Sequence, residues 1–143
     1  MTTPKKPSQY AAVRQALAPQ AVGTGATVNG TTIDVRGFEY MLANVELGAI
    51  SSGAGISVTV KLQESDDGAA WADVTSATTG AVLNANQNTT KLFDLLLSAR
   101  KAFIRAVATG GASGGGLAGV VFHLSRDTIL PVCATVTATE IGY

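Results

Sequence analysis

An alternating segment at residues 56–64, followed at once by a turn, restricts the fold of this chain more than any other feature. Aliphatic residues occupy every second position from Ile56 to Leu62 and polar residues the positions between, which places one face of a β-strand against a core. Asp66, Asp67 and Gly68 then supply a tight turn, because glycine readily adopts the positive φ that other residues avoid. Trp71 begins the return strand. The segment predicts a β-hairpin.

The low charge of the chain limits its function classes. Charged residues make up 14% of the sequence, against about 25% in an ordinary soluble domain. Such a surface favours association, so we expect other copies or another protein to cover part of it. Basic and acidic residues balance at ten each, and no apolar run approaches the ~20 residues of a membrane helix. We therefore expect neither nucleic acid nor a membrane as a partner.

Strand and turn signals dominate the rest of the chain after residue 26. Short apolar or alternating segments recur up to residue 124, separated by glycine and asparagine turns, and give seven or eight strands. This spacing predicts an all-β domain over residues 27–125, an antiparallel β-sandwich of the jelly-roll or immunoglobulin-like type. Residues 126–143 are rich in threonine and valine and fit a final strand or a C-terminal arm.

Residues 1–26 differ in composition and predict an extended N-terminal arm. Their basic residues meet no acidic residue before Asp34, and Ser8 is placed to cap a short helix with apolar residues at positions i, i+3 and i+7. A terminus this poor in core residues is ordered only when something holds it. We expect the arm to bind a neighbouring subunit through Lys5, Lys6, Tyr10, Val13, Arg14 and Leu17.

Acidic residues near the hairpin raise a calcium site as an alternative, since calcium takes six to eight oxygen ligands. These residues are Glu64, Asp66, Asp67 and Asp73. The favoured interpretation is a solvated hairpin tip with Trp71 in the core. On that interpretation the hairpin residues Asp66, Asp67, Gly68 and Trp71 are structural, and no metal is expected.

Residues with catalytic potential are few. His123 is the only histidine and Cys133 the only cysteine, and His123 lies in an expected strand without a third group to orient it. The glycine loop at 109–116 lacks the lysine of a phosphate-binding loop and leads into a strand, so it predicts a flexible connection or a tip that docks on a partner. We expect no enzyme activity, no catalytic residue and no cofactor.

Three stretches resemble small structural proteins encoded beside the capsid genes of tailed bacteriophages, of the head decoration (cement) type. They are Ile33-Asp34-Val35-Arg36-Gly37-Phe38, Leu62-Gln63-Glu64-Ser65-Asp66-Asp67-Gly68 and Trp71-Ala72-Asp73-Val74. The resemblance covers residues 31–75. It implies a β-sandwich component of the virion that lies in the host cytoplasm before assembly and is then clamped onto the outside of the head, with the major capsid protein as its partner. It carries no catalytic residue.

Oligomerisation and two rival functions complete the expectations. Closed symmetry favours a homo-oligomer, with a trimer as the first choice. Another virion component (a head-fibre base, neck or tail protein) is one alternative function. A carbohydrate-binding β-module, supported by Trp71 alone, is the other.

Overall fold

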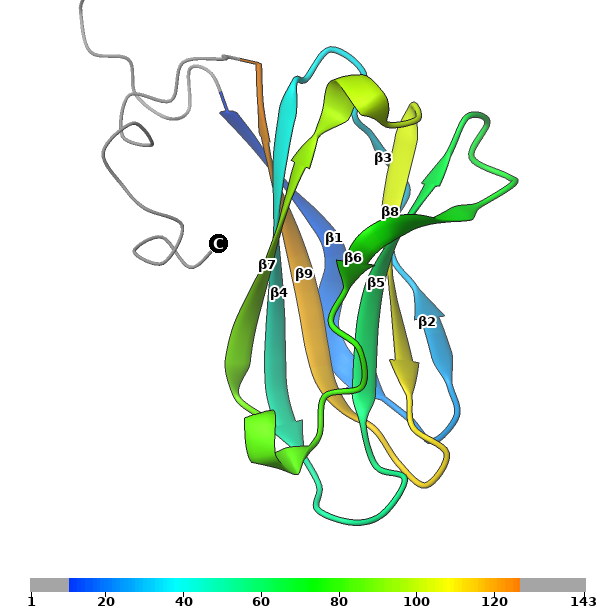
Figure 1. The fold of residues 1–143 in the computed structure, drawn as a ribbon, viewed down its shortest axis with the longest axis vertical. Coiled ribbons are helices and arrows are strands. Elements are labelled where there is room, and N and C mark those ends of the chain that lie inside the picture. The colour runs from blue at the N-terminus through cyan, green and yellow to red at the C-terminus, as the bar shows by residue number, and fades with distance from the viewer. Residues whose placement is uncertain (1–10, 127–143) are drawn as a thin grey trace, which may run out of the picture.

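The computed structural model describes residues 11–126, which form two antiparallel β-sheets packed face to face (Figure 1). The predicted all-β sandwich is confirmed. The first sheet has the order β1 (Ala11–Val22), β9 (Gly116–Ser125), β4 (Tyr40–Ile50) and β7 (Thr89–Leu96). The second has the order β2 (Thr27–Asn29), β8 (Phe103–Gly110), β5 (Val58–Ser65) and β6 (Ala72–Thr78), and β3 (Ile33–Asp34) also pairs with β8. Two 3₁₀ turns, η2 (Asn84–Asn86) and η3 (Leu97–Ala99), flank β7.

The strand order is that of a jelly roll. Strand β1 pairs with β9, β2 and β3 with β8, β4 with β7, and β5 with β6. The chain is thus one long hairpin, folded at the β5–β6 turn and rolled into two sheets. An immunoglobulin domain would instead pair its first two strands in one sheet. Of the two sandwich types expected from the sequence, the topology selects the jelly roll.

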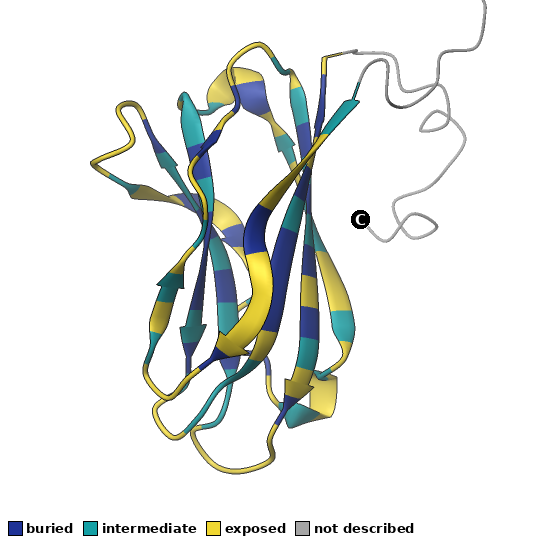
Figure 2. Cartoon of the chain, turned by 180° about the vertical axis from the view of Figure 1, so that it is seen from behind, coloured by how far each residue is buried: buried dark blue, intermediate teal, exposed yellow. Residues whose placement is uncertain are grey.

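Alternating side chains from the two sheets form the core between them, as the banded strands of Figure 2 show. This is the period-two pattern that the sequence displays in its hairpin strand. Each large aliphatic side chain buried in this way contributes about 1.5–3 kcal/mol to folding. The largest fully buried side chains include Met41, Ile50, Leu62, Ile104, Phe122 and Leu124.

The N-terminal segment corrects two expectations. Ala11–Val22 is strand β1, paired with β9 from Ala11↔Ser125 to Val22↔Gly116, so the predicted arm over residues 1–26 and its helix are wrong from residue 11 onward. Two register shifts interrupt the pairing, and both Ala16 and Leu17 reach the core. Val13, which the helical spacing placed on the same side as Leu17, is exposed instead.

Proline is compatible with this strand because β1 lies at the edge of the first sheet and Pro19 falls in the register shift between Leu17 and Gln20, where it has no partner residue on β9. The sandwich therefore begins sixteen residues earlier than the expected boundary at residue 27, since β1 starts at Ala11. Residues 1–10, with Lys5, Lys6 and Tyr10, lie outside the described residues. So do residues 127–143 of the expected C-terminal strand or arm.

Candidate interaction surfaces

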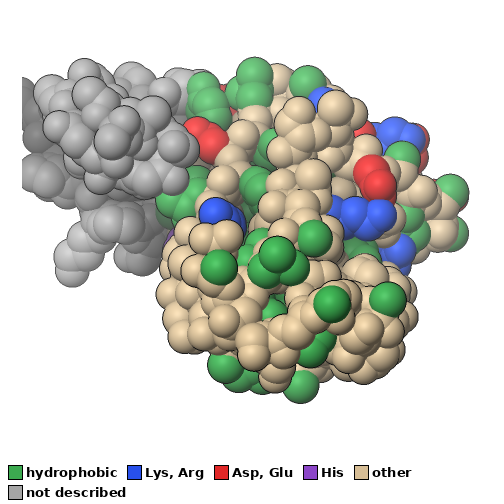
Figure 3. All heavy atoms as spheres, turned by 60° about the horizontal axis from the view of Figure 1, so that its bottom comes forward, with side chains coloured by type: hydrophobic (Ala, Val, Ile, Leu, Met, Phe, Trp, Pro, Cys, Tyr) green, Lys and Arg blue, Asp and Glu red, His purple; other side chains and the backbone are tan. Residues whose placement is uncertain are grey.

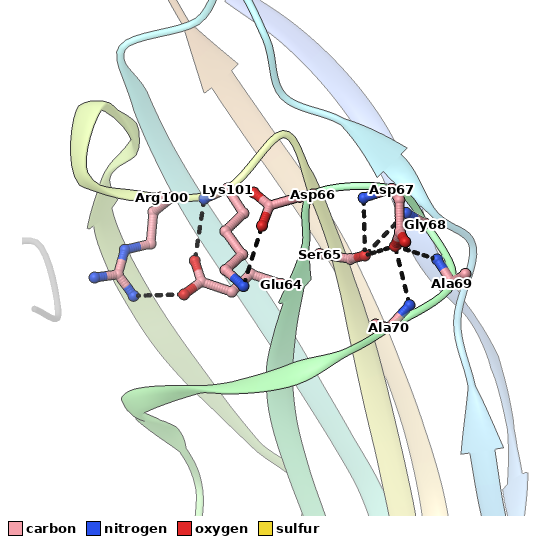
Figure 4. Close-up of polar contacts among 9 residues, drawn as sticks. All are labelled: Glu64, Ser65, Asp66, Asp67, Gly68, Ala69, Ala70, Arg100 and Lys101. Atoms are coloured by element: carbon pink, nitrogen blue, oxygen red, sulfur yellow. Dashed lines mark hydrogen bonds and ion pairs between the residues drawn. The ribbon is translucent and has the colours of Figure 1, made fainter.

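The β5–β6 turn is held by its own side chains, as Figure 4 shows. The Ser65 hydroxyl oxygen accepts hydrogen bonds from the backbone N–H of Gly68 (2.8 Å) and Asp67 (3.3 Å). One Asp67 carboxylate oxygen accepts from the N–H of Ala70 (3.0 Å) and of Ala69 (2.9 Å). Gly68 has φ +76°, the positive value expected from the sequence.

The hydrogen bonds from Ala70, Ala69 and the Ser65 hydroxyl stabilise the ionised form of Asp67 and lower its pKa to about 2. Its carboxylate thus holds the turn together. The hairpin prediction is confirmed, and Asp67 and Gly68 have structural roles in it.

Ion pairs tie the hairpin to the connection between β7 and β8 (Figure 4). Glu64 accepts from the backbone N–H of Lys101 (3.2 Å), and its other oxygen lies 3.6 Å from the Arg100 guanidinium. The Lys101 ammonium lies 3.3 Å from the Asp66 carboxylate. These carboxylates face cations and backbone N–H groups rather than one another. Within residues 11–126, no three His, Cys, Asp or Glu side chains come together as a metal site, so the geometry gives the calcium alternative no support.

Trp71 lies outside the core, and the expectation that it is a core residue is wrong. Its ring is half-buried beneath Arg105, whose guanidinium carbon is 4.3 Å from the ring centroid. Arg105 also donates two hydrogen bonds to the Gln63 side-chain oxygen, and Gln63 donates to Asp73 (2.8 Å). The Gln63 hydrogen bond and the Lys61 ammonium at 3.0 Å lower the pKa of Asp73. Arg105 thus covers one face of the ring.

The outer face of the first sheet is more apolar than the outer face of the second sheet, which carries this polar network. Val13, Leu96 and Leu117 are 59%, 52% and 46% exposed and lie on β1, β7 and β9. His123 is exposed on β9, in register with Val13 and Leu42 on the neighbouring strands. Cys133, the only cysteine of the chain, falls outside the described residues.

Of the predicted partner-binding residues, the three that the structure describes do not share one surface. Val13 and Arg14 are exposed at the start of β1, whereas Leu17 is 2% exposed and belongs to the core. The structure therefore removes Leu17 from the predicted binding set. Sequence reasoning missed the exposed Leu96 and Leu117, which occur in otherwise ordinary strand patterns.

A hollow of about 320 Å³ lies at the end of the sandwich that carries the hairpin turn. Arg36, Arg100 and Lys101 contribute to its lining. Arg36 is bound by the Asp34 carboxylate at 2.7 Å, which holds the pKa of Asp34 at about 2. The other two cations are paired as described above, so this hollow offers no cluster of unpaired cations to an anionic ligand.

The glycine loop is fastened to its neighbours by backbone hydrogen bonds. Gly111 donates to the Ser57 carbonyl (2.9 Å) and accepts from the Gly25 N–H (2.8 Å). Ser113 donates to the Gly55 carbonyl at 2.9 Å. A Cβ atom on Gly110 would overlap the carbonyl oxygen of Gly23, so this close approach requires glycine. Three loops distant in sequence thus form one continuous surface.

Comparison with known proteins gives one informative similarity. No protein-family model and no curated protein matches the chain. The fold is similar to the crystal structure of the SPBc2 prophage-derived protein YomS, with a TM-score of 0.50 and 13% sequence identity. The similarity covers 80% of this chain and 91% of that one. It shows a shared fold, and that fold also occurs in a prophage-derived protein. Within the described residues no helix is long and apolar enough to cross a membrane.

Proposed function

We propose that this chain is a structural protein of a bacteriophage particle, one that binds the outer surface of the head and stabilises contacts between capsid subunits. The observation that carries the proposal is the fold shared with a prophage-derived protein over most of both chains. The resemblance of residues 31–75 to head decoration proteins supports the more specific role. The major capsid protein is the proposed partner, and the virion surface the proposed location.

The outer face of the first sheet fits a role in adhesion. Its exposed Val13, Leu96 and Leu117 give a protein partner apolar surface to cover, while the second sheet is covered with hydrogen-bonded polar groups. Burial of a large aliphatic side chain contributes about 1.5–3 kcal/mol, before the costs of association. Many copies on one capsid lattice would add their weak contacts through avidity.

Strand β1 takes residues 11–22 out of the predicted arm. Lys5, Lys6 and Tyr10 of the predicted binding set come before β1 in the sequence. Val13 and Arg14 follow them on the exposed side of an edge strand. We propose that this segment and the start of β1 contact the neighbouring capsid subunit together.

The direct test is electron microscopy of phage particles that lack the protein. Heads that lose a surface protrusion or break more readily support decoration. Intact heads without a tail, neck or fibre feature would instead support the alternative virion roles. A particle unchanged in every part would contradict the proposal.

A binding experiment tests the surface. The purified chain should sediment with empty heads, and Val13→Asp should weaken this binding by placing a charge in an apolar contact. The matched control is Thr75→Asp, an exposed substitution on β6 of the second sheet. Equal binding by both variants and the unmodified chain would exclude Val13 from the contact.

A further inference from the structure

A hollow of about 360 Å³ opens on the outer face of the first sheet, near the end at which β1 and β4 finish and β9 begins. It forms because glycine occupies outward positions on two neighbouring strands. Gly119 of β9 lies opposite Glu46 of β4, and Gly48 follows two residues later on β4. No side chain rises from either glycine, so the backbone of the sheet forms the floor of the hollow.

Two apolar side chains form the walls of the hollow. A Cβ atom on Gly119 would lie 3.1 Å from the Cα atom of Pro19, and one on Gly48 would lie 2.8 Å from the Cβ atom of Leu117. Pro19 and Leu117 therefore stand directly against the two glycines, and both line the hollow. A cavity built on sheet backbone has its shape before a partner arrives, so binding in it loses little conformational entropy.

Glu46 is the charged residue in the lining of the hollow. The Thr90 hydroxyl donates a hydrogen bond to one of its carboxylate oxygens (3.0 Å), which holds the carboxylate beside the hollow. Within the described residues, Glu46 forms no ion pair with a lysine or an arginine. Its carboxylate can therefore bind a cation that comes from another molecule.

The surroundings of Glu46 add a second acidic residue and no lysine or arginine at an outward position of the described strands. Asp94 of β7 is exposed and points outward, as Glu46 does. Arg14 pairs with the buried Phe122 and so belongs to the inner row of β1. Lys91 pairs with the buried Val45 and belongs to the inner row of β7. The outer face of the first sheet is thus acidic as well as apolar.

The loops beside the hollow supply no charge either. Figure 3 turns this end of the sandwich forward and shows backbone, small polar and scattered hydrophobic side chains across it. The four loops contain no charged residue and lie at residues 23–26, 51–57, 79–88 and 111–115. Glu46 is therefore a single charge at the border of an uncharged surface.

We propose that the hollow binds an arginine side chain of a protein partner. The Glu46 carboxylate attracts a cation, the apolar walls suit the aliphatic stem behind that cation, and arginine supplies both. Its planar guanidinium forms two parallel hydrogen bonds with a carboxylate and is more weakly hydrated than the ammonium of lysine, which favours arginine over lysine. This inference deepens the proposed function and rests on it for the choice of a protein as the partner.

Other classes of ligand do not fit this chemistry. Nucleic acids and anionic lipid surfaces bind to cationic side chains, whereas this face is acidic. A neutral apolar group would take water from the Glu46 carboxylate without replacing it, which costs free energy. A divalent cation of the calcium type takes six to eight oxygen ligands, and within residues 11–126 no three His, Cys, Asp or Glu side chains come together.

The test is a titration of the purified, isotope-labelled full chain with N-acetyl-arginine methylamide, followed by NMR. The backbone amide signals of Gly48 and Gly119 report directly on the floor of the hollow. They should shift along a saturable curve with a dissociation constant of about 1–20 mM, the range for a ligand of this size. N-acetyl-citrulline methylamide has the same shape without the charge and should bind about fivefold more weakly. High salt should reduce that difference, because it screens the ion pair.

Variants of the two acidic residues identify the group that selects arginine. Glu46→Gln removes the charge and keeps an oxygen for the Thr90 hydroxyl, so it should bind the arginine and citrulline probes with equal affinity. The matched control is Asp94→Asn, the same change of charge on the same face, which should keep the preference for arginine. Thr90→Val, which releases the carboxylate, is a second variant for use if Glu46→Gln fails to fold, and it should reduce that preference.

Three results would overturn the proposal. The first is the absence of a saturable shift of the Gly48 and Gly119 signals up to about 50 mM of the arginine probe. The second is a citrulline probe that binds the unmodified chain as tightly as the arginine probe does. The third is a preference for arginine that survives Glu46→Gln, or one that Asp94→Asn removes to the same extent.

These titrations use no capsid, so they separate the two proposals. A chain that binds the arginine probe but does not sediment with empty heads would contradict the proposed function alone. A chain that sediments with heads but does not bind the probe would contradict the arginine site alone.

Discussion

Gly68 gives the most sharply defined test of the fold, because its structural requirement is purely conformational. Its φ is +76°, and a Cβ atom built on it meets no other atom within 4 Å. Gly68→Val therefore introduces backbone strain without a steric clash elsewhere. A non-glycine residue held at this positive φ destabilises the folded state by roughly 1–2 kcal/mol, and a β-branched residue lies at the upper end of that range. For a domain of this size that loss corresponds to a decrease in melting temperature of about 3–8 °C.

The assay is thermal and urea unfolding of Gly68→Val beside two controls. Gly68→Asn should lose clearly less stability, because asparagine tolerates the left-handed region better than other residues. Ala69→Val places the same side chain on the exposed neighbouring residue, which has no positive φ, and should leave the melting temperature nearly unchanged. An unchanged melting temperature for Gly68→Val, or equal losses for both valine variants, would refute the assignment of the strain to Gly68.

Three further predictions concern the close backbone approach at Gly110, the hairpin turn at Asp67 and the edge strand at Leu17. Gly110→Ala should destabilise the domain more than Gly68→Val in urea unfolding, because its Cβ would overlap the Gly23 carbonyl oxygen; a smaller loss would contradict the close approach. The pKa of Asp67 is lowered from 3.8 to about 2, so its contribution to stability is present above about pH 4 and is lost as the pH falls toward 2. Melting temperatures of Asp67→Asn should accordingly fall less steeply than those of the unmodified chain over that range, and parallel curves would contradict the pKa shift. Leu17→Ala should lower the free energy of unfolding by about 2–5 kcal/mol, the range for truncating a buried leucine. A change near zero would contradict the burial of Leu17 in the core.

Local chemistry explains why the hairpin was predictable from the sequence. Strand β5 has one face in the core, so its alternation is intact, and the turn depends on side chains within a few residues of one another. The position of Trp71 depended on a distant residue instead. Arg105 comes from β8, which pairs with β5 in the sheet, and it draws the indole ring to the outer surface.

Strand β1 could not be recognised from the sequence because the strand it pairs with lies at the other end of the chain. Its partner β9 begins at Gly116, about a hundred residues later, and no local pattern reports that pairing. The register shifts around Leu17 also remove the period-two alternation by which strands are recognised. A bulged edge strand with small residues and a proline thus has the composition of an arm, although the sheet needs it to cover the edge of β9.

The division of the molecule into a charged and an uncharged end could not have been predicted without the topology. The four uncharged loops, at residues 23–26, 51–57, 79–88 and 111–115, alternate along the chain with the charged connections at residues 35–39, 66–71 and 97–102, so neither set forms a continuous segment in the sequence. Rolling one long hairpin into two sheets sends alternate turns to opposite ends and thereby sorts the charges. Because Ala11 pairs with Ser125 beside Tyr40, the segment before β1 leaves from the charged end. A capsid contact through the N-terminal segment would then lie about 35 Å from the four uncharged loops, which is the length of an eleven-residue strand such as β4.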